Sequence, residues 1–186
     1  YKFNGQIKNE SGIVAGDTLK IGNISDRGFV IDRQLTLMPL NNTSKISNGF
    51  IHLVKGSDGS TVSGLTINNT KGALSINGIY VGQLHGIWIT KSNNNTIVNN
   101  TIRIANAAGV YAMPMGWSSY NRIIGNDMST YITCVMVMGQ CHYNIISKNK
   151  LETLDYNDLI VSNLIYFNPF GHADYGGSPL CLGNVI

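Results

Sequence analysis

The apolar and polar positions of this chain repeat in a short phrase, Asn-x-Ile-x-x-Asn-x-Ile. Three close copies begin at Asn95, Asn121 and Asn144, and a weaker copy spans residues 60–67. Aligned on their first isoleucine, the three copies lie about 26 and about 23 residues apart, within the period of solenoid repeats. β-Branched residues flanked by Asn, Gly and Ser are typical of short strands between turns. The pattern therefore predicts a stack of small coils.

A second strand phrase follows each copy, at residues 109–113, 134–138 and 158–161. Two strands and their turns in about 23 residues leave no room for a helix, so each coil must bury its apolar side against a neighbour. We therefore predict an all-β fold, a parallel β-helix (solenoid) with coils of about 23–26 residues. Two inward columns are expected: Ile97, Ile123 and Ile146 in one, and Ile102, Met128 and Leu151 in the other.

The repeated asparagines are predicted to be structural. Asn tolerates left-handed backbone conformations at turns. Asparagines at equivalent places in stacked strands also form amide ladders. Two such ladders are expected, one of Asn95, Asn121 and Asn144 and one of Asn100, Asn126 and Asn149.

The regularity varies along the chain, which we interpret as one domain and as a segment of a longer protein. Residues 1–58 are expected to form irregular N-terminal coils, and residues 59–167 the regular repeats. Residues 168–186, rich in Pro and Gly at their start, are expected to form a lateral loop and the start of a further coil.

Composition excludes several classes of protein. Charged residues make up 12% of the chain, a low share that could suggest disorder. However, 43% hydrophobic content with clear periodicity argues against disorder. The net charge of +3 is spread without a basic run, so nothing indicates nucleic-acid binding. No apolar run is long enough for a transmembrane helix, so no membrane span is expected.

Cysteines and glycosylation motifs bear on location. Cys134, Cys141 and Cys181 do not make a disulfide framework, although a Cys141–Cys181 bridge remains open. Asn-x-Ser/Thr motifs are dense in the first 100 residues and favour a surface or secreted protein. Their asparagines are Asn9, Asn23, Asn41, Asn42, Asn68, Asn94 and Asn99.

Residues 30–37 and 56–67, followed by the repeated phrase, resemble the right-handed parallel β-helix family with pectin-lyase-like topology. Within this family, the chain is most similar to adhesin-like surface proteins of methanogenic archaea and to NosD-type β-helix proteins. The resemblance covers roughly residues 18–165 and implies a right-handed coil, but its phrase is a coil signature that implies little about function.

Catalysis on this fold needs clustered carboxylates on an outer face. The expected outward column of Thr66, Thr101, Asp127 and Lys150 contains one carboxylate, and the Asn-Thr-Asp, Asp-Asp and Gly-His-Gly motifs of polygalacturonase-like relatives are absent. The nearest acid cluster, at Glu152, Asp155 and Asp158, lies between two strands, where acids commonly cap turns. No catalytic residue is predicted.

Copper binding is an alternative, because some relatives are copper-associated and soft ligands suit Cu(I). The candidate donors are Met113, Met115, Met136, Met138, Cys134, Cys141 and His142. Since methionines also fill space in and beside strands, no metal site or cofactor is predicted.

A binding face is the favoured functional feature. If strand alternation turns the flanking valines and isoleucines inward, Tyr80, Tyr111 and Met136 point outward in register, and Trp88 is a further candidate for the same face. Such an aromatic stripe binds sugars or proteins unless a flanking loop covers it.

The sequence thus predicts a non-catalytic extracellular module of an adhesin-like surface protein that binds a glycan or a surface protein through an outer face. A polysaccharide lyase or hydrolase of the same fold is the first alternative, and a NosD-like copper-associated protein is the second.

Overall fold

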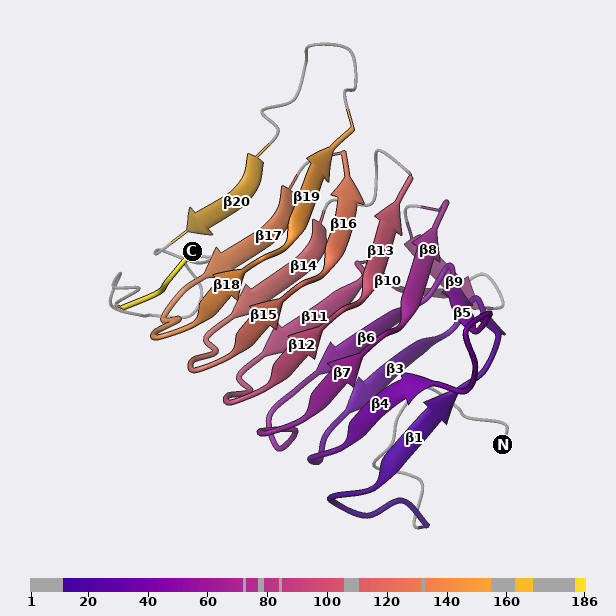
Figure 1. Cartoon of the computed structure of the whole chain (residues 1–186). Helices are drawn as coiled ribbons and strands as arrows, with labels where there is room; N and C mark the ends of the chain where they lie inside the picture. Colours follow the sequence, from indigo (N-terminus) through magenta and orange to yellow (C-terminus); the bar gives the residue numbers. More distant parts are fainter. Residues whose placement is uncertain are drawn as a thin grey trace.

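The computed structural model describes residues 12–71, 73–76, 79–83, 85–105, 111–131, 133–154, 163–168 and 183–186. These residues form strands and turns and contain no helix. Three parallel sheets of six strands each stack their strands in sequence order (Figure 1). The prediction of an all-β parallel solenoid is confirmed.

Each sheet takes one strand from every coil. The first sheet contains β1 (Thr18–Ile21), β4 (Thr36–Pro39), β7 (Thr61–Ser63), β12 (Thr96–Val98), β15 (Arg122–Ile124) and β18 (Ile145–Ser147). The second sheet contains β2 (Ile24–Ser25), β5 (Lys45–Ser47), β8 (Thr66–Asn69), β13 (Thr101–Ile104), β16 (Asp127–Thr130) and β19 (Lys150–Thr153). The third sheet contains β3 (Gly28–Ile31), β6 (Phe50–Leu53), β11 (Ile87–Thr90), β14 (Tyr111–Gly116), β17 (Thr133–Met138) and β20 (Asn163–Asn168).

A coil therefore has three strands, and the expectation of two strands per coil is wrong. The repeated phrase bends in its middle, so that β12 ends at Val98 and β13 begins at Thr101. Between them Asn99 has a φ of 55°, and Gly125 and Lys148 have φ values of 67° and 57° at the same place in the next two coils. This left-handed residue ends one strand and turns the chain into the next.

A left-handed residue also forms the corner between the third and first sheets. Its left-handed residues immediately precede the first ladder position in five successive coils, from Ser60 to Asn184. They are Gly59, Asn94, Tyr120, Tyr143 and Gly183, with φ values of 77°, 58°, 61°, 54° and 65°. Gly and Asn adopt this conformation easily, which explains why the sequence repeats them at the corners.

The core is made of continuous apolar columns. Ile97 pairs with Val62 on one side and Ile123 on the other, and Ile123 pairs with Ile146. All four are buried. Ile102 and Met128 are buried in a second column, and Leu151 packs against it partly buried. Both predicted inward columns are therefore confirmed.

Hydrogen bonds between asparagines join the coils at two corners. The Asn95 amide donates to Asn121 Oδ1 at 2.9 Å, and the Asn121 amide donates to Asn144 Oδ1 at 3.1 Å. The corresponding bonds from Asn100 to Asn126 and from Asn126 to Asn149 are both 3.0 Å. Each acceptor oxygen also receives the backbone N–H of the preceding ladder residue. Since these side chains are nearly all buried, the ladders satisfy polar groups that water cannot reach.

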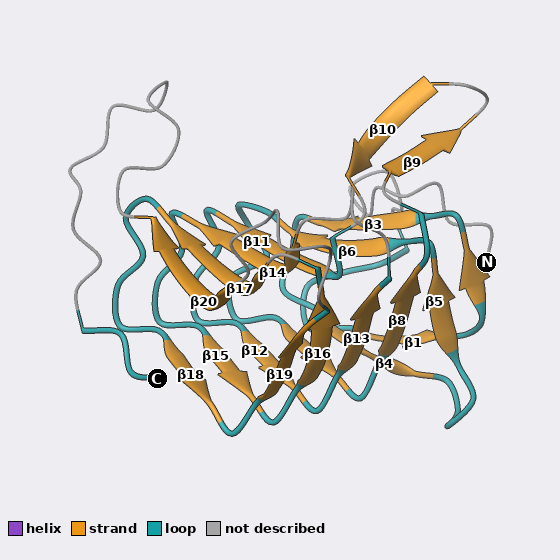
Figure 2. Cartoon of the chain, turned by 90° about the horizontal axis from the view of Figure 1, so that it is seen from above, coloured by secondary structure: helices purple, strands orange, loops and turns teal. Residues whose placement is uncertain are grey.

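One coil is longer than its neighbours. The step from Ser60 to Asn95 is 35 residues, against 26 and 23 for the next two. The additional length contains the antiparallel hairpin of β9 (Ala73–Ile76) and β10 (Ile79–Gln83). Figure 2 shows this hairpin extending away from the coils on the side of β3 and β6. At the other end of the chain, Asn184 accepts the Asn144 amide at 3.0 Å and continues the first ladder.

Candidate functional site

The outer face of the third sheet carries a column without charged side chains. Val30 pairs with His52, His52 with Trp88, and Pro114 with Met136. Trp88 and Pro114 occupy equivalent positions, because the next inward residues, Ile89 and Met115, are paired. Apolar and aromatic side chains therefore follow one another along five coils.

The predicted composition of this stripe is only partly right. Trp88 and Met136 belong to the column, but Tyr111 pairs with Thr133 and is not in register with Met136. The reason is that β14 continues to Gly116 and pairs with β17 in a register that puts Pro114 opposite Met136. Tyr80 lies on β10 of the hairpin, outside the three coil sheets.

Trp88 and Tyr111 also belong to a compact group with two histidines, which the sequence analysis missed. The His52 and Trp88 rings stack with centroids 4.1 Å apart and planes within 6°. His85 meets Trp88 edge-on at 5.2 Å and stacks on Tyr111 at 5.6 Å. We call these four residues the histidine–aromatic cluster. It joins β6, β11 and β14 on the outside of the solenoid.

Both histidines of the cluster are held neutral. Burial lowers the pKa of His52 to about 4, and the neighbouring His85 adds to this effect. Burial also lowers the pKa of His85 to about 4, against the opposing influence of a backbone hydrogen bond with Tyr111. Within the described part of the chain, His85 Nδ1 is buried without a hydrogen-bond partner, whereas His52 Nε2 lies 3.0 Å from Thr90 Oγ1.

Exposure divides the column into an accessible part and a covered part. Pro114 is buried, and Met136 is only 7% exposed although it faces outward. His52, Trp88 and Tyr111 are half-buried and keep part of their surface open to solvent. An external ligand can therefore reach the cluster but not the Met136 end of the column.

The cluster makes folding stability sensitive to acid. In the unfolded chain these histidines bind protons below about pH 6.5, whereas in the folded chain they stay neutral down to about pH 4. Stability should be complete above pH 6.5 and fall as the pH drops through that window, by about 2 kcal/mol per histidine at pH 5. Urea unfolding of the wild type and of the His52→Phe/His85→Phe variant measures this loss. An equal loss between pH 6.5 and 4 in the double variant would contradict the assignment.

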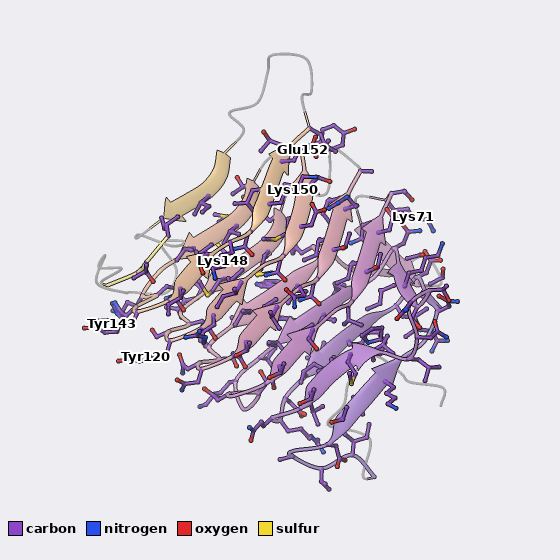
Figure 3. The ribbon with its side chains drawn as sticks, in the orientation of Figure 1. Lys71, Tyr120, Tyr143, Lys148, Lys150 and Glu152 are labelled. Atoms are coloured by element: carbon purple, nitrogen blue, oxygen red, sulfur yellow. The ribbon has the colours of Figure 1, made fainter. Side chains whose placement is uncertain are left out.

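The second sheet carries charges on its outer face, and Figure 3 labels Lys150 and Glu152 there. Asp127 Oδ2 lies 2.7 Å from Arg103 and 4.0 Å from Lys150. The hydrogen bond from Arg103 holds the pKa of Asp127 below its usual value, so this carboxylate is an ion-pair partner and a poor general acid. Asp127 has Thr101 and Lys150 beside it in the sheet. Glu152 pairs with Ser129, and Asp155 and Asp158 lie outside the described residues.

The candidate copper donors do not converge. Met113 and Met115 lie in the core, whereas Met136 and Met138 alternate with the buried Val135 and Val137 on the opposite face of their sheet. Cys141 Sγ is buried and accepts the Ser118 backbone N–H at 3.3 Å. Burial raises the pKa of Cys134 to about 11, which makes its thiol a poor ligand. In the described ranges, no three His, Cys, Asp or Glu side chains could hold a metal, and Cys181 falls outside those ranges.

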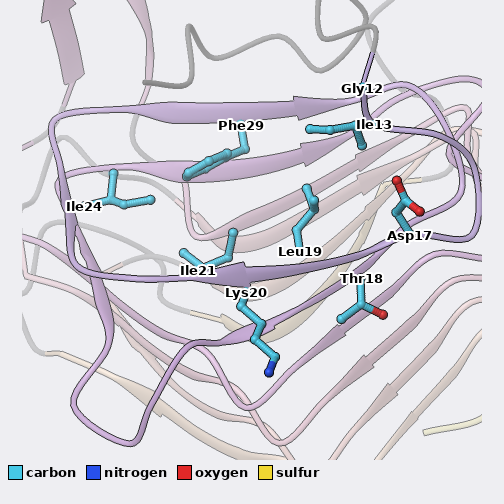
Figure 4. A pocket seen from close by; sticks show the side chains of 9 residues that line it. All are labelled: Gly12, Ile13, Asp17, Thr18, Leu19, Lys20, Ile21, Ile24 and Phe29. Atoms are coloured by element: carbon cyan, nitrogen blue, oxygen red, sulfur yellow. The ribbon is translucent and has the colours of Figure 1, made fainter. Parts of the chain in front are cut away.

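A cavity of about 400 Å³ opens at the N-terminal end of the core (Figure 4). Its walls are mainly the apolar side chains of Ile13, Leu19, Ile21, Ile24 and Phe29. Asp17 and Lys20 are the ionisable residues of the lining, and Asp17 Oδ2 accepts the Val14 backbone N–H at 2.8 Å. The described lining thus contains one carboxylate, whereas glycoside hydrolysis normally uses two.

Comparison with protein-family models, with curated proteins and with solved structures gave no match for this chain. Across the residues that the structure describes, no helix is long and apolar enough to cross a membrane. The fold therefore defines the class of protein, a parallel β-solenoid, and function has to be argued from its outer surfaces.

Proposed function

We propose that this chain is a non-catalytic recognition module of an extracellular, adhesin-like β-solenoid protein, which binds a glycan or a surface protein through the histidine–aromatic cluster. The resemblance to pectin-lyase-like β-helices and to adhesin-like archaeal surface proteins supports the extracellular location. The dense glycosylation motifs support it as well.

One observation carries the proposal. Trp88 lies half-buried on an outer sheet face, stacked on His52 and in a T-shaped contact with His85. These contacts fix the indole ring before any ligand arrives, so little side-chain entropy is lost on binding. Aromatic side chains with fixed geometry and partial exposure are the usual centres of binding energy at recognition surfaces.

The enzyme alternative has less support. Asp127 is tied to Arg103, and its neighbours in the sheet are a threonine and a lysine. Glycoside hydrolysis normally needs two carboxylates across the scissile bond. The nearest second outward carboxylate is Glu152, which lies on the adjacent strand two residues beyond Lys150, the partner of Asp127, so that the pair is diagonal and Lys150 lies directly beside Asp127.

Substitution at the cluster tests the proposal. In chain made without glycosylation, Trp88→Ser and Tyr111→Ser should each weaken attachment to glycan arrays, or to isolated cell-surface material of the source organism, by about tenfold or more. Tyr120→Asn is the matched control, because it removes an exposed aromatic ring that lies away from the cluster, at the corner between the third and first sheets. Thermal unfolding would show that all three variants remain folded.

Equal attachment by the wild type and both cluster variants would contradict the proposal. Loss of attachment in Tyr120→Asn, but not in the cluster variants, would place recognition at Tyr120, at the corner between the third and first sheets. Tyr80→Ser tests separately whether the hairpin takes part.

A further inference from the structure

Two tyrosines occupy backbone positions that suit Gly or Asn better. At the corner between the third and first sheets, the left-handed column runs Gly59, Asn94, Tyr120, Tyr143 and Gly183. A bulky side chain rarely adopts positive φ, and such strain is retained where the side chain has a role. Tyr120 and Tyr143 are 54% and 51% exposed, so packing in the core is not that role.

The two rings form a stack along the solenoid axis. Their centroids are 5.2 Å apart and their planes are within 17°, and Figure 3 shows both side chains at the edge of the coils. Tyr143 covers Gly183 on one side, where any β-carbon would clash with the tyrosine ring. The stack ends at Tyr120 on the other side, and the next position in the column is Asn94.

The backbone places Asn94 one coil above Tyr120. The Asn94 N–H donates to the carbonyl of Ser119 at 3.1 Å, and the Asn95 N–H donates to Asn121 Oδ1 at 2.9 Å. Adjacent parallel strands are about 4.8 Å apart, so a group attached to the Asn94 side chain can reach the ring of Tyr120. Asn94 is exposed and opens the acceptor motif Asn94-Asn95-Thr96.

We propose that Asn94 is N-glycosylated and that its first sugar ring lies on Tyr120, extending the tyrosine stack by one unit. The inference rests on the extracellular location in the proposed function. The Asn94 amide nitrogen would bond to the anomeric carbon of a polyprenyl-pyrophosphate-linked oligosaccharide. The amide proton would leave to a base, and the sugar–oxygen bond would break to release the polyprenyl pyrophosphate. The apolar C–H face of the sugar suits the negative face of the aromatic ring.

The chain contains a matched control at the next corner. Asn99 is also exposed, has a φ of 55°, and opens the motif Asn99-Asn100-Thr101 directly before a ladder asparagine. The following position in its column is Gly125. The Asn99 N–H donates to the carbonyl of Ile124, the residue before Gly125, at 3.2 Å. A sugar on Asn99 therefore has no aromatic ring beneath it.

The test uses the chain secreted from a eukaryotic host, with its glycans trimmed to a single N-acetylglucosamine. Mass spectrometry of glycopeptides should find Asn94 occupied. NMR should show ring protons of the Asn94 sugar shifted upfield by Tyr120 and restored to normal in Tyr120→Asn, while the Asn99 sugar is unshifted. Asn94→Gln should lower the thermal midpoint of the glycosylated chain by about 2–4 °C, but not that of chain made in a non-glycosylating host.

An empty Asn94 beside occupied neighbouring motifs would overturn the site, and an occupied Asn94 with an unshifted sugar would overturn the stacking. Both results leave the recognition proposal standing, because attachment through Trp88 is measured on unglycosylated chain. Absence of sugar from every motif, in protein isolated from its source, would overturn this inference and contradict the extracellular location as well.

Discussion

Ile123→Asp should unfold this protein or leave it close to unfolding. Ile123 is fully buried between Ile97 and Ile146 in the central column of the first sheet. A carboxylate there has no partner, so the charge must remain unpaired or take up a proton, at a cost of about 4 kcal/mol or more. Domains of this kind have roughly 5–15 kcal/mol of total stability, so this loss is a large share of it. Urea unfolding monitored by circular dichroism measures the change.

The neighbouring residue supplies the control for this substitution. Ile124 faces outward, is half-buried, and pairs with Val98 and with Ser147, so its column already accepts a polar side chain. Ile124→Asp should therefore cost less than about 1 kcal/mol. An unchanged unfolding midpoint in Ile123→Asp, or equal losses in the two variants, would show that the assigned inward face is wrong.

Asn121→Ala should have the second-largest effect. The Asn121 side chain accepts the Asn95 backbone N–H and the Asn95 amide, both at 2.9 Å, and donates to Asn144 Oδ1. Truncation removes the acceptor of the buried Asn95 N–H and the donor to the Ser92 carbonyl, whereas the Asn95 amide keeps Ser92 Oγ and Asn144 Oδ1 keeps the Asn121 N–H. Each unsatisfied group costs about 1–3 kcal/mol, so a total loss of about 3 kcal/mol is expected.

Asn68→Ala is the matched control for the ladder. Asn68 also lies on a short strand of the repeat, but its side chain is exposed, and its loss should change stability by less than about 0.5 kcal/mol. Thermal and urea unfolding of both variants, made without glycosylation, give the comparison. Equal stability of Asn121→Ala and the wild type would mean that the amide ladder contributes nothing to stacking of the coils.

The sequence predicted the core and the coil stacking because both depend on local rules. Alternation within three- and four-residue strands turned Ile97, Ile123 and Ile146 to one side, and the spacing of the asparagines set the register. The third strand of each coil was missed because the bend at Asn99 and Lys148 takes only two residues and falls inside the repeated phrase, which was interpreted as one strand. A left-handed Lys leaves no signal in composition.

The histidine–aromatic cluster could not be found in the same way. From the sequence, His52 and Trp88 can be recognised as neighbours only if the coil between them is known to contain a hairpin. That coil is 35 residues long, so the repeat period does not predict which residues of its flanking strands pair. The alternation of residues 51–53 did place His52 outward between two buried neighbours. Its partner followed only from the three-dimensional register. Tyr111 was assigned to the wrong column because β14 continues beyond the predicted strand phrase, and its Pro114 takes the position opposite Met136.

Hydroxyl-radical footprinting tests most directly whether recognition occurs at the outer face of the third sheet. The wild-type chain is oxidised alone and in the presence of isolated cell-surface glycan or protein of its source, and modification is measured at each aromatic side chain. We expect the bound partner to protect Trp88 and Tyr111 and to leave Tyr120 and Tyr143 as reactive as before. Unchanged reactivity of Trp88 and Tyr111 in a saturated complex would contradict it.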